Sequence, residues 1–370
     1  MRVEDKQRVI IEVVQRVLER ATASPESIEA ALFDTIYYER QRLKKEAATD
    51  LARKQSSFYQ RIYQTAQSVG SEEQRELLRQ ILESFSEEVA GHFDPRVYSL
   101  ATRIVPPTLA ALLNALSPLR LMEELSDGGG KLEQHLQFAG DLEALRRAVN
   151  QGTTVLVPTH SSNLDSILVG FTLELLGLPP YTYGAGLNLF SNRVMGFFMH
   201  NLGAYKVDRL KKAPIYKDIL KTYAGLSMEL GYHNLFFPGA TRSRSGAVER
   251  KLKLGLLGMA LDAYIHNLQS KKARPDIFIV PCTINYQLVL EAETLIEDHL
   301  KEVGKSRFII TDDEFSKPKR ILDFMSKLFS MNSRITLTFS QPMDVFGNKV
   351  DDQGISRDRC GRPIDRQRYV

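Results

Sequence analysis

The chain of 370 residues contains only two cysteines, Cys282 and Cys360, so it cannot carry the disulfide framework of a small secreted domain. Its first residues, MRVEDKQRVIIEVVQ, lack the uninterrupted apolar core of a secretory signal. Both absences lead us to expect a protein of the reducing cytoplasm.

Long hydrophobic runs are also missing. A membrane-spanning helix needs roughly 20 largely apolar residues without a break. The nearest candidate, Ile104 to Met122, is interrupted by prolines and by Arg120. We therefore expect this segment to pack inside the protein or to lie at an interface.

A strong charge imbalance is absent as well. Forty-nine basic residues face 45 acidic ones, which gives a net charge of +4. This excess is too small to predict nucleic-acid binding, but it suits anionic small molecules or a lipid surface. We expect no nucleic-acid partner.

Two common loop motifs are not found. The glycine run at Ser126 to Gly130 is not followed by the Gly-Lys-Ser/Thr of a nucleotide-binding loop, and it is typical of a linker. No serine stands in the G-x-S-x-G turn of a serine esterase.

Helical periodicity dominates the first part of the chain. Ile10, Val13, Val14, Val17 and Leu18 recur at helical spacing. Ser24-Pro25 predicts the start of a second helix, and Ser71 with Gln74 resembles a capping box before another. Residues 1–125 are therefore predicted to be an all-helical region whose amphipathic helices serve packing.

Beyond the linker, short apolar runs alternate with helical patterns, which indicates an α/β domain. We assign this domain to residues 126–345 and a polar, loosely held tail to 346–370. The strands are expected at 153–157, 234–237, 277–280 and 335–339, and the helices at 164–176 and 253–266.

The first site candidate is the pair His160 and Asp165, placed where a predicted strand ends and a helix begins. Strand carboxyl ends are where α/β folds place their chemistry. An ionised Asp165 in the first helical turn can orient the imidazole, and the other nitrogen of His160 can then accept a proton from a substrate alcohol. Taken alone, this spacing equally fits a helix cap beside a solvated histidine.

Two basic clusters follow short apolar runs. The first contains Lys206 and Arg209, after Gly203, and the second contains Arg242 and Arg244 among small residues. Guanidinium groups and backbone amides in such a setting can converge on a phosphate. The small residues of the second cluster are Thr241, Ser243, Ser245 and Gly246. Lys211 and Lys212, by contrast, are expected to be solvated.

The fourth element is the apolar strand from Ile279 to Tyr286, which Pro281 interrupts. It is expected to be a core strand, with the alternative that it walls an acyl tunnel. Cys282 is interpreted as a small buried apolar residue and not as a nucleophile.

These four elements, in this order, resemble the motif blocks of the glycerolipid acyltransferase superfamily over residues 150–345. His160-x4-Asp165 is similar to its catalytic H-x4-D motif, and Phe237 to Gly246 is similar to its third block. That block has Glu-Gly where this chain has Gly239-Ala240. The helical N-terminal region and the stretch from Tyr286 to His299 look closest to the glycerol-3-phosphate acyltransferases.

The resemblance implies a mixed sheet with helices on both faces and acyl transfer in phospholipid synthesis. His160 would be the base and Asp165 its orienting group, with no metal and no cofactor beyond the co-substrate, acyl-CoA or acyl carrier protein. The acceptor would be glycerol 3-phosphate, at its sn-1 hydroxyl, on the cytoplasmic membrane surface. The implied phosphate ligands are Arg242, Arg209, Arg244 and Lys206, and the implied pocket residues are Gly203, Thr241, Ser243, Gly246 and Pro281.

Three alternatives remain open at this point. The acceptor is 1-acylglycerol 3-phosphate (lysophosphatidate) instead, or the chain is a serine esterase, or it is a non-catalytic lipid-binding protein. The missing acidic residue at Gly239 motivates the last of these.

Overall fold

The computed structural model describes residues 2–46, 49–101, 136–162, 165–190, 193–239, 243, 252–287 and 334–366. The apolar segment Ile104 to Met122 and the glycine linker therefore lie outside the described residues. Among the helices that are described, none combines the length and the apolar character needed to cross a bilayer.

The N-terminal region is helical, as predicted. It contains α1 (Val3–Ala21), α2 (Pro25–Leu43), α3 (Asp50–Ala66) and α4 (Ser71–Val89). The apolar stripe of α1 is buried, with Val13 fully inaccessible and Val17 nearly so. Ser24 caps α2 as expected, because its side chain accepts a hydrogen bond from the Ser27 amide and the Ser24 amide in turn donates one to the Ser27 hydroxyl.

The start of α4 differs from the prediction by one residue. Gly70, not Ser71, is the N-cap, and its amide donates to the Glu73 carboxylate at 3.3 Å. Glu73 therefore provides the return bond that the sequence pattern assigned to Gln74. A glycine cap lacks a side-chain acceptor, so only half of a capping box forms.

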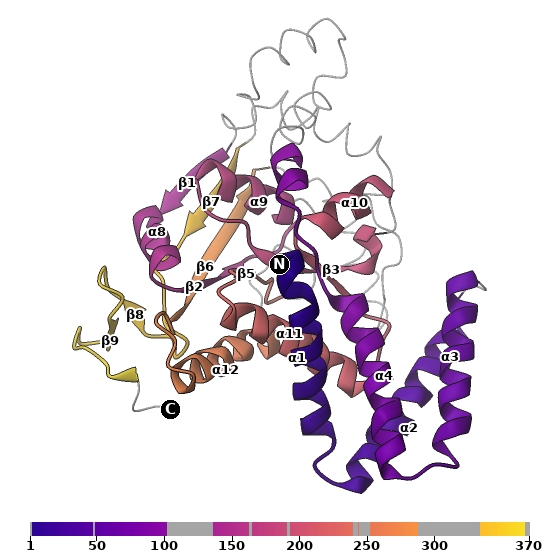
Figure 1. Cartoon of the computed structure of the whole chain (residues 1–370). Coiled ribbons are helices and arrows are strands. Elements are labelled where there is room, and N and C mark those ends of the chain that lie inside the picture. The colour runs from indigo at the N-terminus through magenta and orange to yellow at the C-terminus, as the bar shows by residue number, and fades with distance from the viewer. Residues whose placement is uncertain are drawn as a thin grey trace, which may run out of the picture.

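A seven-stranded mixed sheet forms the centre of the second region (Figure 1). Its order is β1-β7-β6-β2-β5-β3-β4, and β6, β2, β5, β3 and β4 run parallel, whereas β7 pairs antiparallel with β6 and parallel with β1. The strands are β1 (Leu136–Gly140), β2 (Thr153–Pro158), β3 (Thr182–Gly186), β4 (Ala204–Val207), β5 (Asn234–Leu235), β6 (Ile277–Tyr286) and β7 (Ile335–Phe339). The predicted mixed α/β fold is confirmed.

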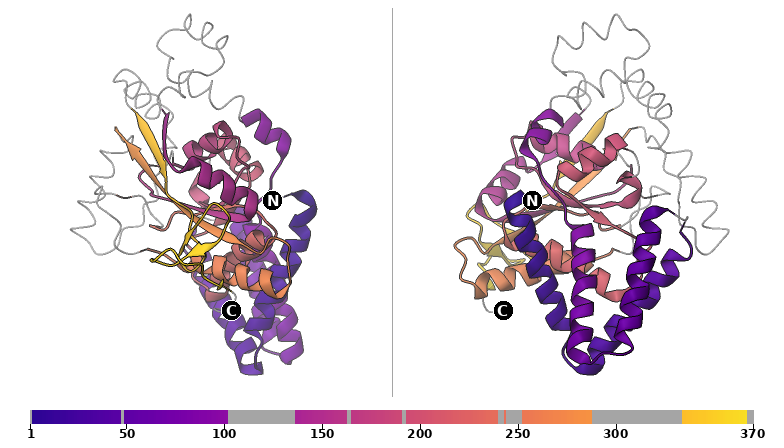
Figure 2. Two further views of the ribbon diagram at one scale, coloured as in Figure 1. Left: turned by 90° about the vertical axis from the view of Figure 1, so that its left-hand side faces the viewer. Right: turned by 45° about the vertical axis from the view of Figure 1, so that its right-hand side comes forward.

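Helices cover both faces of this sheet, as two views of the molecule show (Figure 2). Alternate residues of β2 separate the faces. Leu156 packs in a cluster with α8 (Leu142–Gln151) and α9 (Asp165–Leu175), whereas Val155 packs in a cluster with α12 (Gly255–Gln269) and the end of α11 (Pro214–Glu229). The short η1 (Leu187–Phe190) and α10 (Arg193–Asn201) precede β4.

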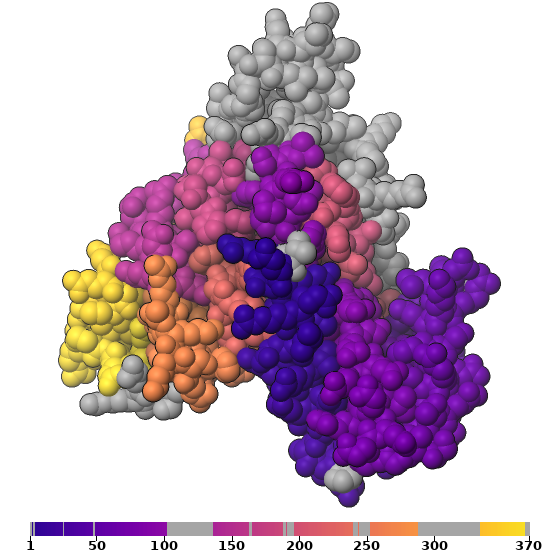
Figure 3. Space-filling view, viewed as in Figure 1, coloured from indigo at the N-terminus to yellow at the C-terminus, as the bar shows by residue number. Residues whose placement is uncertain are grey.

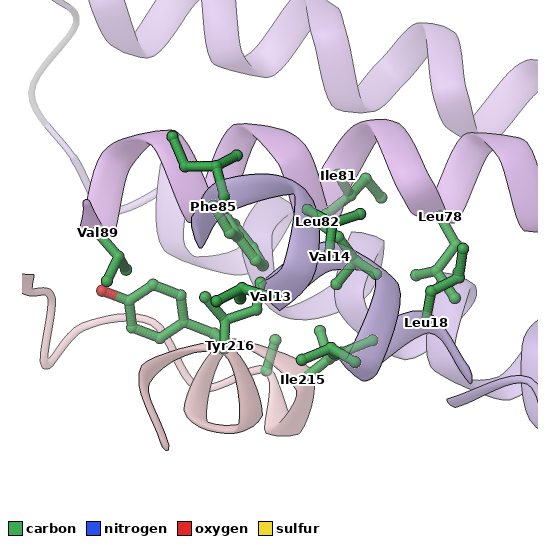
Figure 4. Close-up of a cluster of buried hydrophobic side chains, with 14 of the residues drawn as sticks. Val13, Val14, Leu18, Leu78, Ile81, Leu82, Phe85, Val89, Ile215 and Tyr216 are labelled. Atoms are coloured by element: carbon green, nitrogen blue, oxygen red, sulfur yellow. The ribbon is translucent and has the colours of Figure 1, made fainter. Parts of the chain in front are cut away.

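The N-terminal helices pack onto α11, on one side of the sheet. In the space-filling view α1 lies between α12 and the purple helices α2 to α4 (Figure 3). Side chains of α1, α4 and α11 point toward one another in a shared apolar cluster (Figure 4). Phe85 of α4 and Tyr216 of α11 meet edge to face, with ring centroids 5.3 Å apart.

The C-terminal segment is more ordered than the sequence led us to expect. Asp344, Asp351 and Asp358 each begin the same turn, in which the aspartate Oδ1 accepts from the amides two and four residues later. A glycine with positive φ stands three residues after each of them: Gly347, Gly354 and Gly361. The prediction of a loosely held tail is therefore wrong for residues 346–366.

These turns build a small meander that includes β8 (Lys349–Val350) and β9 (Ser356–Arg357). The meander is anchored to the domain by two ion pairs, Arg147 with Asp352 at 2.6 Å and Arg366 with Asp276 at 2.7 Å. The repeat of seven residues, with Asp at its first and Gly at its fourth position, explains the order.

Candidate active site

His160 and Asp165 are in direct contact at the carboxyl end of β2. His160 lies in the loop after the strand, and Asp165 is the first residue of α9, as the sequence predicted. The His160 Nδ1 atom is 2.8 Å from Asp165 Oδ2. Asp165 is fully buried, whereas the His160 side chain is 19% exposed.

The hydrogen bonds of Asp165 Oδ2 determine which nitrogen of His160 carries the proton. This oxygen also accepts from the backbone amides of Ser161 at 2.7 Å and Ser162 at 3.0 Å. It must therefore be an acceptor for His160 too, so Nδ1–H donates and Nε2 keeps its lone pair. Such a histidine can take a proton from an alcohol.

The neighbouring strands hold the His160 loop in place. The Thr159 amide donates to the Cys282 carbonyl at 3.0 Å, and the Thr159 hydroxyl accepts from the Ile284 amide at 2.9 Å. The imidazole ring of His160 stacks on Phe237, with centroids 4.3 Å apart. The Ser243 amide donates to the His160 carbonyl at 2.7 Å. The H-x4-D segment, the segment from Phe237 to Gly246 and the strand from Ile279 to Tyr286 thus meet at His160.

One residue at this site was missed by sequence reasoning. The hydroxyl of Tyr286, the last residue of β6, donates a hydrogen bond to Asp165 Oδ1. Its position at the end of the proline-containing strand gave no signal for this contact, because 121 residues separate the partners.

Cys282 is buried, as predicted, and it is unsuited to act as a nucleophile. Burial, together with the nearby charge of Asp165, raises the pKa of its thiol to about 12. A thiol with such a pKa stays protonated and therefore unreactive at neutral pH.

The first basic cluster, Lys206 and Arg209 after Gly203, lies apart from His160. Arg209 follows the edge strand β4, which β5 and β3 separate from β2. Three strand spacings of about 4.8 Å give a separation of roughly 14 Å between β4 and β2. The Lys206 ammonium lies 5.5 Å from the centre of the Phe190 ring. Gly203 has a φ of 87° and forms the turn into β4, with its amide donating to the His92 carbonyl at 2.7 Å.

Lys211 contradicts the expectation that it is solvated. It is 4% exposed, and its ammonium lies 2.8 Å from Glu88 Oε2, 3.6 Å from Glu39 Oε2 and 4.1 Å from the centre of the Phe85 ring. These partners belong to α2 and α4, far away in sequence, which is why the local pattern did not reveal them. Lys212 is exposed, as expected.

Several predicted site residues lie outside the described part of the chain: Thr241, Arg242, Arg244, Ser245 and Gly246. Their roles stay predictions. Pro281 is described and pairs with Val157 of β2, close to where β6 changes its partner from β2 to β7. The strand of the fourth block is thus a central core strand, as expected, and a role of Pro281 in an acyl pocket stays a prediction.

Comparison with known proteins adds the family. The family model described as Acyltransferase matches residues 140–285. Among similar proteins are a glycerol-3-phosphate acyltransferase of Pseudomonas syringae pv. tomato, 28% identical over 200 residues, and a dihydroxyacetone phosphate acyltransferase of Oryctolagus cuniculus, 30% identical over 183 residues.

These matches cover 50% and 49% of this chain, and 23% and 26% of the two relatives. The chain therefore spans about a quarter of the length of the relatives it matches. The matched region nevertheless contains β2, α9 and all of β6 except its last residue, Tyr286. Residues 140–285 of this chain are therefore similar to the Acyltransferase family over the region that holds the His160 site.

Proposed function

We propose that this protein transfers a fatty acyl group from an acyl thioester to the sn-1 hydroxyl of glycerol 3-phosphate. The observation that carries the proposal is the hydrogen bond from His160 Nδ1 to buried Asp165, which leaves Nε2 as a base on a partly exposed side chain. The names of the similar acyltransferases support the acceptor class.

The proposed reaction is a direct transfer. His160 Nε2 takes the proton of the acceptor hydroxyl while the oxygen of that hydroxyl attacks the thioester carbonyl carbon. The tetrahedral intermediate collapses with cleavage of the carbon–sulfur bond, and the leaving thiolate takes the proton from the imidazolium. Asp165 stabilises that imidazolium without becoming protonated. The proposal requires neither a metal nor a covalent acyl-enzyme.

Binding of the acceptor phosphate is assigned to Arg242 and Arg209, with Arg244 and Lys206 as further ligands. Arginine suits a dianionic phosphate because its planar fork forms two parallel hydrogen bonds. The separation between β4 and β2 implies that a phosphate held by Arg209 sits to one side of His160. The carbon chain of the acceptor would then bridge toward the base.

We also place the protein at the cytoplasmic face of a membrane, because the acylated product is a lipid and the chain is mildly basic. Binding to anionic lipid vesicles that is reversed by high salt would support this peripheral attachment. Binding that survives both high salt and alkaline wash would argue against it.

The proposed activity is tested by thiol release from acyl-CoA and acyl carrier protein thioesters, with and without acceptor. Release that depends on glycerol 3-phosphate supports the transferase, release without acceptor indicates an esterase, and no release with either donor indicates a lipid-binding protein. Dihydroxyacetone phosphate belongs in the acceptor panel because a similar protein bears its name. Lysophosphatidate completes the panel, and the preferred acceptor identifies the reaction.

A further inference from the structure

The second carboxylate oxygen of Asp165 has its own hydrogen-bond donor. Oδ2 receives the His160 ring N–H and two backbone amides, whereas Oδ1 receives the hydroxyl of Tyr286. Asp165 is completely buried, so its carboxylate cannot exchange these donors for water. Loss of one donor would leave a buried oxygen with no compensating solvent.

The geometry of β6 explains how Tyr286 reaches this oxygen. Side chains of a strand alternate between its faces, so Cys282, Ile284 and Tyr286 share one face. Cys282 and Ile284 pack in the same apolar cluster as Leu168 of α9, and Tyr286 packs against that cluster. Since α9 begins at Asp165, the end of β6 lies beside the start of the helix.

The strand β6 extends past the point where β2 ends. Its first part, to Cys282, pairs with β2, and its last part, from Cys282 to Tyr286, pairs with β7 instead. Tyr286 is opposite Ile335 in that antiparallel pair. The extension is therefore held by backbone hydrogen bonds from β7, which fixes the tyrosine on a rigid element.

We propose that Tyr286 is a positioning residue that acts on His160 through Asp165. Its hydroxyl fixes the carboxylate so that Oδ2 faces the His160 ring, and it withdraws part of the carboxylate charge through Oδ1. The inference rests on the proposed acyl transfer for its catalytic consequence. The structural claim concerns the free protein and does not depend on a substrate.

The expected consequence for His160 has a definite sign. Without the tyrosine hydroxyl, Asp165 shares less of its negative charge, so it stabilises the imidazolium more strongly and raises the His160 pKa. Titratable groups that contact or electrostatically influence Asp165 include His160, Tyr286 and the Cys282 thiol. The thiol stays neutral near pH 7, so it does not compete for this effect.

Tyr286→Phe removes only the hydroxyl and tests the proposal. We expect kcat to fall by about tenfold while both KM values change by less than about twofold, because positioning of the base affects only the chemical step. The acid limb of the pH profile should move to higher pH by about half a unit. In an Asp165→Asn background the same substitution should change kcat by less than about twofold.

Tyr181→Phe is the matched control. Tyr181 is a buried tyrosine, whereas Tyr286 is partly buried, and the Tyr181 hydroxyl lies 2.5 Å from Thr154 Oγ1 near the amino-terminal ends of β2 and β3, away from His160. Its loss should lower the thermal unfolding temperature and leave kcat and the pH profile unchanged. Equal kinetic effects in both variants would show that Tyr286 serves only stability.

The pKa of His160, measured by NMR in the free protein, separates this proposal from the proposed function. A wild-type protein without acceptor-dependent activity would end the proposed function, yet the NMR comparison would still test Tyr286. An upward shift in Tyr286→Phe, absent in Tyr181→Phe, supports the positioning role. An unchanged His160 pKa, or a rise in acceptor KM at full kcat, would overturn it.

Discussion

At the scale of single residues, the four hydrogen bonds to Asp165 determine what His160 can do. Three donors converge on Oδ2 and one on Oδ1, so the carboxylate is held from the loop and from β6 at once. A carboxylate held in this way keeps the imidazole in one tautomer and supports its positive charge during the reaction.

Asp165→Asn is expected to lower kcat by about 10² to 10⁴ with little change in acceptor KM. The amide is neutral, so it no longer supports the imidazolium. Steady-state kinetics with varied glycerol 3-phosphate would measure both constants. Asp141→Asn, which alters the carboxylate that caps α8 by accepting the Ala144 amide, is the control and should retain full activity. Lost acceptor affinity at full kcat in the Asp165 variant would make Asp165 a binding residue.

Arg242→Lys should raise the acceptor KM by about tenfold or more, because lysine keeps the charge but loses the two parallel hydrogen bonds to phosphate. The donor KM should change less. Arg53→Lys, at an arginine of α3 that is 70% exposed, is the control and should have no effect. A donor constant that rises more than the acceptor constant would assign Arg242 to the thioester carrier instead.

The sequence supports part of this site and not the rest. His160 and Asp165 are five positions apart, in the loop after β2 and at the first residue of α9, so local structure alone brings them together. Tyr286 meets Asp165 only because β6 lies beside β2 and extends past it. Such pairing between distant strands leaves no local pattern, and the hydroxyl contact was therefore not predicted.

At the scale of elements, ion pairs of the buried Lys211 connect the loop after β4 to the N-terminal helices. Lys211 contacts Glu88 of α4 and Glu39 of α2, and Glu39 also pairs with Arg42 at 2.8 Å. Arg209 stands in the same loop, two residues before Lys211. The helical region thus helps to position a residue assigned to the phosphate site.

Lys211→Met is expected to lower the free energy of unfolding by about 3 kcal/mol, because it leaves the buried Glu39 and the partly buried Glu88 without the lysine cation. Urea unfolding followed by circular dichroism would measure this. Lys212→Met removes the neighbouring, exposed lysine and should change stability by less than about 0.5 kcal/mol. Equal losses in the two variants would contradict the buried network.

The C-terminal turns show what an element-level pattern can and cannot convey. Their polar composition suggested a loosely held tail, yet Asp and Gly recur at fixed positions of a seven-residue repeat. Aspartate side chains that bond nearby amides, followed by glycines with positive φ, are the chemistry of tight turns. The polar composition therefore led to a wrong prediction, whereas the spacing of Asp and Gly could have predicted the turns.

At the scale of the whole molecule, the sequence predicts the fold class but not the sheet order. Alternating strands and helices indicated an α/β domain with an all-helical region before it, and both are present. The strand β3 and the edge strand β4 are short and half polar or glycine-containing, so no apolar run marked them. The packing of α1 and α4 on α11 depends on side chains that are far apart in the sequence.

The stability of the whole fold should fall as the pH drops below neutrality, because burial lowers the pKa of His233 to about 4. In the unfolded chain the His233 imidazole binds a proton near pH 6.5, whereas in the folded chain it does so only near pH 4. Protonation of His233 therefore favours unfolding between these two pH values. This residue alone should cost about 2 kcal/mol between about pH 7 and about pH 5. The pKa of His200 is lowered as well, first by burial, and adds in the same direction.

Urea unfolding at the two pH values would measure this loss. His233→Asn keeps an acceptor for the Thr154 amide, which now donates to His233 Nδ1 at 3.0 Å, and should flatten the pH dependence. His266→Asn, at a histidine whose side chain is 44% exposed, should leave it unchanged. A wild-type protein equally stable at both pH values would contradict the prediction.

The central claim is that His160 is the base for acyl transfer to a glycerol phosphate. It is tested most directly by thiol release from acyl-CoA or acyl carrier protein thioester, with and without glycerol 3-phosphate, in wild type and His160→Ala. We expect the acceptor-dependent rate to fall by about 10² to 10⁴ in the variant. Its fold should persist, because Asp165 keeps its other three hydrogen-bond donors. Acceptor-dependent release that continues at the wild-type rate in folded His160→Ala would contradict the account.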